Sequence, residues 1–178
     1  MYHKSCHHYH WHNPMHNSKN KNYQGYHPQY NWNNTNSNPY EIMNLRDYGQ
    51  CPLVINIDQA AKQNNTYRTA LWTGNYFQVT LMSINIGDDI GLEVHPTTDQ
   101  FIRIEEGQGL VQMGDRKDNL DFQVMAYDDY AIMIPAGKWH NITNTGNSPL
   151  KIYVIYAPPE HPYGTVHETK AIAMSAEG

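Results

Sequence analysis

Hydrophobic and polar residues alternate over much of the chain from residue 40 onward, and the clearest case lies between Tyr76 and Ile86. One set of alternate positions holds Phe77, Val79 and Leu81, and the other holds Gln78, Thr80 and Met82. Side chains alternate between the two faces of a β-strand, so this pattern predicts a strand with one apolar and one mixed face. Parity alone leaves open whether the mixed face points into a lumen or toward solvent.

Further short runs are separated by Gly, Pro, Asn and Asp, which favour turns. They cover Ile55–Ile57, Phe101–Ile104, Gly109–Met113, Tyr130–Ile134, His140–Asn144 and Lys151–Tyr156. After the first run, Asp58 is suited to cap a short helix through Gln63, because its carboxylate can accept from the free N–H groups of the first turn. Several short strands at this spacing predict an all-β domain, either a sandwich or a small barrel.

The first 40 residues have a different composition, rich in His, Asn and Tyr and without Leu, Ile or Val. Such a segment buries too little apolar surface to offset the entropy of ordering. We therefore expect a disordered leader over residues 1–40 and a folded domain with a C-terminal extension over residues 41–178. The leader is interpreted as a solvated tail, with loose metal binding by its imidazoles or surface adhesion as alternatives.

Charge and hydropathy narrow the possible partners. The formal net charge is −5 over 178 residues, and no face is rich in Lys and Arg, so we expect no nucleic-acid partner. No apolar run approaches a membrane span, and the N-terminus lacks the features of a secretion signal. Cys6 and Cys51 form no CxxC motif and are expected to be reduced thiols, which favours a soluble, cytoplasmic protein.

Two spaced motifs carry the strongest chemical signal. They read Gly87-x5-Glu93-x-His95-x4-Gln100-x6-Gly107 and Pro135-x-Gly137-x2-His140-x3-Asn144. These motifs resemble those of the cupin superfamily, in which three histidines and a glutamate hold one metal inside a jelly-roll (double-stranded β-helix) barrel. Relative to that pattern, Glu93 replaces the first histidine, Gln100 replaces the glutamate, and Asp129 replaces the glycine that usually opens the second motif.

The resemblance implies a metal site formed by Glu93, His95, Gln100 and His140. This set keeps one carboxylate and two imidazoles, which suit Fe(II), and which with oxygen ligands also suit Mn, Ni, Zn or Co. The amide of Gln100 is a weaker ligand than a carboxylate, so it either coordinates loosely or hydrogen-bonds a bound water or substrate oxygen. A polar pocket without metal is the competing interpretation.

The segments Leu71–Gly74 and Glu93–Phe101 are similar to a group of small bacterial cupins often labelled as phosphomannose-isomerase-like, over residues 52 to 172. That similarity implies a small-molecule ligand and a homodimer. It favours a metal-dependent isomerase acting on a small polar or sugar-like metabolite, with an Fe(II)-dependent dioxygenase or a noncatalytic sugar-binding or coat-associated protein as alternatives. The proline-rich run after Ala157 either closes the barrel mouth, with His161 or His167 reaching the site and serving as a base, or packs as a surface extension.

Overall fold

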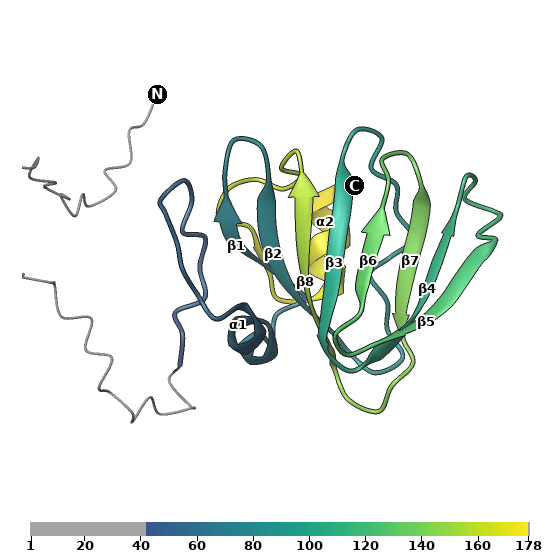
Figure 1. The fold of residues 1–178 in the computed structure, drawn as a ribbon, viewed down its shortest axis with the longest axis horizontal. Coiled ribbons are helices and arrows are strands. Elements are labelled where there is room, and N and C mark those ends of the chain that lie inside the picture. The colour runs from purple at the N-terminus through teal and green to yellow at the C-terminus, as the bar shows by residue number, and fades with distance from the viewer. Residues whose placement is uncertain (1–41, 178) are drawn as a thin grey trace, which may run out of the picture. The chain divides into compact units, whose positions relative to one another are not determined.

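The structure, a computed structural model, describes residues 42–177, and the leader predicted over residues 1–40 lies outside this range. Within it, two short helices and nine strands follow one another (Figure 1). They are α1 (Ile57–Gln63), β1 (Arg68–Thr73), β2 (Gln78–Ile84), β3 (Asp99–Glu106), β4 (Gln108–Gly114), β5 (Phe122–Tyr127), β6 (Ala131–Ile134), β7 (Trp139–Asn144), β8 (Leu150–Ala157), β9 (Val166–His167) and α2 (Lys170–Glu177). No helix in this range is long and apolar enough to cross a membrane.

The strands form two antiparallel sheets. The larger sheet has the order β6-β3-β8-β2-β1-β9 and the smaller one the order β5-β4-β7. One hydrophobic cluster combines residues of both sheets, with Ile102 and Ile152 from the larger sheet and Val111 and Ile142 from the smaller one. The core therefore lies between the two sheets, as the all-β jelly-roll prediction requires.

The two faces of β2 settle the question that parity left open. Met82 packs in the core between the sheets, and Gln78 and Thr80 on the same face are fully buried. On the opposite face, Val79 and Leu81 pack against α1. The mixed face therefore points into the barrel, and the apolar face is covered by the short helix rather than exposed to solvent.

Two local predictions near α1 are wrong. Residues 55 and 56 form no strand, and the helix begins at Ile57 with Asn56 as its N-cap, whose side chain accepts from Gln59 N at 3.1 Å. Asp58 instead lies in the first helical turn, where its carboxylate pairs with Lys62. An asparagine caps a helix as well as an aspartate does, and the acidic residue in the first turn stabilises the positive end of the helix dipole.

The prediction of reduced thiols is also wrong for Cys51, which is disulfide-bonded, whereas Cys6 lies outside the described residues. The expectation of a cytoplasmic location therefore loses this part of its support.

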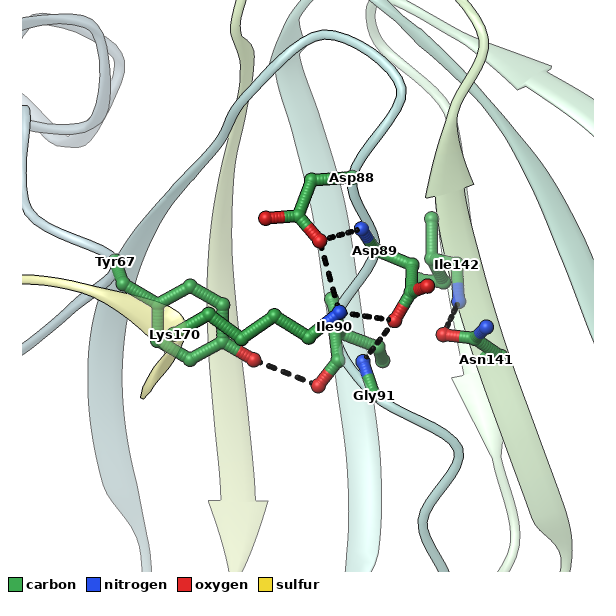
Figure 2. A network of polar contacts seen from close by, with 8 residues as sticks. All are labelled: Tyr67, Asp88, Asp89, Ile90, Gly91, Asn141, Ile142 and Lys170. Atoms are coloured by element: carbon green, nitrogen blue, oxygen red, sulfur yellow. Dashed lines mark hydrogen bonds and ion pairs between the residues drawn. The ribbon is translucent and has the colours of Figure 1, made fainter. Parts of the chain in front are cut away.

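Lys170, the first residue of α2, contacts the turn at the start of the first motif (Figure 2). Lys170 donates to Asp88 at 2.8 Å and to Asp89 at 2.7 Å. Beside them, the Tyr67 hydroxyl donates to the Ile90 carbonyl at 2.7 Å. The start of α2 and the turn are thus held by ion pairs in a partly buried setting.

Candidate metal centre

Glu93 and His140 are placed opposite each other by the backbone. Glu93 N donates to His140 O at 3.1 Å, and His140 N donates to Glu93 O at 2.9 Å, so the two residues form a hydrogen-bonded antiparallel pair. His95 lies two residues after Glu93 and shares its direction, as an extended segment predicts. The side chains of Glu93, His95 and His140 are 18%, 11% and 1% exposed.

The three side chains converge on one point. Glu93 Oε1 lies 3.2 Å from His95 Nε2 and 3.3 Å from His140 Nε2. Ligands about 2.1 Å from a common ion are separated by about 3.0 Å in an octahedron and about 3.4 Å in a tetrahedron, so the spacing fits a shared divalent ion. Both Nε2 atoms are buried without a well-aligned hydrogen bond. A buried nitrogen in this condition is costly unless something binds it, and an ion between the three groups would do so.

The other nitrogen of each ring has its own partner, which fixes the ring orientation. His140 Nδ1 lies 2.9 Å from the Lys138 carbonyl oxygen, and His95 Nδ1 lies 3.1 Å from Glu160 Oε1. Since a carbonyl and a carboxylate oxygen can only accept, both of these partners favour the tautomer with the proton on Nδ1. In the neutral imidazoles this leaves the Nε2 lone pairs directed toward the cluster, the tautomer that metal binding requires.

Charge within the cluster is also suited to a cation. Burial raises the pKa of Glu93, but contact with the imidazoles of His140 and His95 outweighs burial and lowers that pKa to about 2. Burial lowers the pKa of His95, but the carboxylates of Glu93 and Glu160 outweigh it and raise that pKa above its ordinary value. Glu93 is therefore anionic at neutral pH, and a bound ion would compete with a proton for His95.

Gln100, the fourth predicted ligand, is the second residue of β3 and faces the interior. It is 4% exposed, and neither its amide oxygen nor its amide nitrogen has a hydrogen-bond partner within the described residues. In the ladder it lies opposite Tyr156, whose ring contacts that of His95 with centroids 5.7 Å apart. Gln100 thus lies on the same inner wall as the cluster, and its role as a ligand stays a prediction.

The two histidines of the C-terminal segment occupy different places. His161 is buried, and its ring packs edge-on against Tyr156 with centroids 5.0 Å apart. Burial, with a contribution from the charge of Arg68, lowers the pKa of His161 to about 3. His167 instead lies in β9, paired with Arg68 of β1. Of the two, His161 is the one that lies beside the residues lining the candidate centre.

Sequence reasoning missed Glu160, which contacts His95 directly. The signal available was a carboxylate next to His161, in a segment that the sequence predicted could reach the site.

A separate cavity of about 500 Å³ lies away from the cluster, lined by residues that include Tyr67, Asp88 and Lys170. This cavity is not the candidate centre, because none of the three converging side chains lines it.

The comparisons with known proteins agree with this geometry. Residues 80–156 match the family described as Cupin domain. An uncharacterised Bacillus subtilis protein, YrkC, is 66% identical over 140 residues, which cover 78% of this chain and 75% of that protein. An uncharacterised protein of Acanthamoeba polyphaga mimivirus is 39% identical over 114 residues, covering 64% of this chain and 69% of that protein.

A protein from Bacillus halodurans provides a crystal structure for comparison. It is 66% identical, has a TM-score of 0.73, and the match covers 73% of this chain and 98% of that chain. The similarity in sequence thus extends to the arrangement of the two sheets. The chain belongs to the cupin superfamily.

Proposed function

We propose that the protein is a metal-dependent cupin that acts on a small polar or sugar-like metabolite by isomerase-type chemistry, with the ion held by Glu93, His95 and His140. The observation that carries the proposal is the convergence of two buried, unsatisfied Nε2 atoms on one carboxylate oxygen at 3.2 and 3.3 Å. The donor set suits Fe, Mn, Ni, Zn or Co and does not select among them.

A divalent ion at this point would supply Lewis acidity, which polarises a substrate carbonyl or orients a pair of hydroxyls. The chain's own residues supply the setting. Gln100 offers an amide NH2 group as donor and an amide oxygen as acceptor on the inner wall, suited to a substrate hydroxyl or a bound water. His161 is neutral at neutral pH, and its low pKa makes it a weak base, better suited to hydrogen-bonding a substrate than to abstracting a C–H proton.

Metal binding is tested by replacing single ligands in the full chain, so that the His-rich leader contributes the same background to every sample. Wild type is expected to hold one more tightly bound ion per chain than His140→Ala, measured by elemental analysis after dialysis. Glu93→Gln removes the carboxylate among the proposed ligands and should weaken metal affinity severely, whereas Gln100→Glu should be tolerated or bind more tightly. Glu106→Gln, an exposed charge change at the far end of β3, is the matched control. Equal affinity of wild type and Glu93→Gln would show that Glu93 is not a ligand.

An Fe(II)-dependent dioxygenase is the second candidate, favoured by the count of two imidazoles and one carboxylate around the convergence point. The two chemistries differ in what they consume. Isomerisation exchanges a substrate C–H proton with solvent deuterium and ignores oxygen, whereas a dioxygenase takes up oxygen only with its substrate. A panel of sugars and small acids, followed by mass spectrometry and an oxygen electrode, separates them. Silence in both assays would favour the noncatalytic binding protein.

A further inference from the structure

The imidazole of His95 lies between two carboxylates. Glu93 Oε1 is 3.2 Å from Nε2, and Glu160 Oε1 is 3.1 Å from Nδ1. Glu93 belongs to the family motif region, but Glu160 comes from the segment after β8, beyond residues 80–156 that match the family. A neutral imidazole has one N–H proton, so the two carboxylates compete for it. With the proton on Nδ1, the Nε2 lone pair is free to bind an ion. With the proton on Nε2, it is not.

Glu160 is held in place from two directions. Its second oxygen, Oε2, accepts a hydrogen bond from Thr98 Oγ1 at 2.9 Å, and Thr98 is 4% exposed. The next residue, His161, is fastened through its backbone to the buried side chain of Gln78, at 2.9 and 3.0 Å. The carboxylate therefore has little freedom to turn away from His95. Because it contacts the Nδ1 side of the ring, Glu160 is not placed to bind the ion that Nε2 faces.

We propose that Glu160 is a positioning residue, which accepts the Nδ1–H of His95 and so presents the Nε2 lone pair to the metal. The inference rests on the proposed metal site and adds to it a residue outside the family's matched region. Carboxylate–histidine–metal arrangements of this kind typically contribute about 10- to 100-fold to metal affinity. The corresponding partner of His140 is the Lys138 carbonyl oxygen, which no side-chain substitution removes. Glu160 is therefore the partner open to mutation.

Loss of Glu160 has a specific consequence, because Glu93 then attracts the ring proton alone. The proton should move to Nε2, the nitrogen that the ion needs. Glu160→Leu removes the acceptor and is expected to weaken Co²⁺ binding about 10- to 100-fold. Glu160→Gln keeps a neutral hydrogen-bond acceptor and should lose less Co²⁺ affinity than Glu160→Leu. Thr98→Val removes the hydrogen bond that holds the Glu160 carboxylate, so its Co²⁺ affinity should lie between those of wild type and Glu160→Leu. Thr98→Ser keeps the hydroxyl and should bind Co²⁺ like wild type.

Two measurements on the full chain test the proposal. Co²⁺ titration followed by visible absorption gives the affinity, with His95→Ala defining the background and Glu106→Gln as the charge control. Long-range ¹H–¹⁵N NMR of the metal-free protein at pH 9 gives the His95 tautomer. We expect Nδ1–H in wild type and Nε2–H in Glu160→Leu, with Glu160→Gln deciding if the leucine variant does not fold.

The outcomes separate this inference from the proposed function. If wild type binds Co²⁺ no better than His95→Ala, the metal site is wrong, and the tautomer measurement still reports on Glu160. If wild type binds Co²⁺ but the Glu160 variants bind it equally, with the tautomer unchanged, the role of Glu160 is overturned. A purely structural role would lower stability without moving the proton.

Discussion

The buried side chain of Gln78 connects the barrel to the segment that follows β8, and its replacement should be costly. Its amide nitrogen donates to Thr73 Oγ1 at 2.8 Å and to the His161 carbonyl at 2.9 Å, and its amide oxygen accepts from His161 N at 3.0 Å. Gln78 has no exposed surface. Methionine has nearly the same shape but can form none of these bonds, so Gln78→Met isolates their contribution.

The expected loss of stability in Gln78→Met follows from the buried polar groups that lose their hydrogen bonds to Gln78. The substitution leaves the N–H and C=O of His161 without this partner in a buried setting, at about 1–3 kcal/mol for each group. Thr73 loses less, because its hydroxyl also donates to Asp47 at 2.6 Å. We therefore expect a loss of about 3 kcal/mol in the free energy of unfolding. For a chain of this size that corresponds to a fall in Tm of about 6–12 °C.

Urea unfolding followed by circular dichroism gives the stability, and hydrogen exchange at the His161 amide shows whether the effect is local. Gln123→Met is the matched control, because Gln123 is exposed on β5 and should change stability by less than about 0.5 kcal/mol. The reasoning is refuted if Gln78→Met costs less than about 1 kcal/mol while the His161 amide stays protected.

Four further results are expected. Lys170→Met should destabilise by about 1 kcal/mol, less at high salt, because partly exposed ion pairs are screened; no salt dependence would contradict this. Asp88 and Asp89 outweigh burial and raise the pKa of Lys170, and Lys170 lowers the pKa of Asp88 despite burial. The stabilisation from these ion pairs should therefore be complete between pH 3.8 and pH 10.5, the ordinary pKa values of the two groups. It should be lost in acid as the pH falls through the lowered pKa of Asp88. It should be lost in alkali as the pH rises through the raised pKa of Lys170. At Asp129, whose φ is +68°, glycine should stay within about 1 kcal/mol of wild type and valine should cost more, measured by urea unfolding; equal effects would contradict this. Light scattering of the full chain should give about twice the mass of one chain, as expected for a homodimer, and a monomer at micromolar concentration would count against it.

Alternation predicted β2, in which apolar and polar residues alternate along the sequence, and it failed for β1, whose residues do not alternate in this way. In β1, residues 68–71 are all buried, because the strand lies between the barrel core and the segments around α1. Such a strand has no period of two to detect. The strand β5 was not predicted for the opposite reason, since most of its residues are exposed. The helix α2, which begins at Lys170 after the proline-rich run, was not predicted.

The site was predictable as far as motif spacing extends. Spacing placed Glu93 and His95 together, and the structure brings His140 to them from a distant strand. Spacing did not indicate Glu160, because its contact with His95 depends on where the chain goes after β8. Long-range contacts of this kind follow from the packed fold rather than from local pattern. The part of the site that lies outside the family motifs was therefore the part that required the structure.

The backbone pairing of Glu93 with His140 separates the geometry of the centre from its chemistry. Two reciprocal main-chain hydrogen bonds fix the distance between these positions, whatever side chains they carry. A substitution at position 93 therefore changes the ligand without asking the fold to rearrange. Glutamate stands here at the position where the cupin pattern that the motifs resemble has a histidine. The donor set of the candidate centre can thus be changed at one position while the backbone frame stays the same.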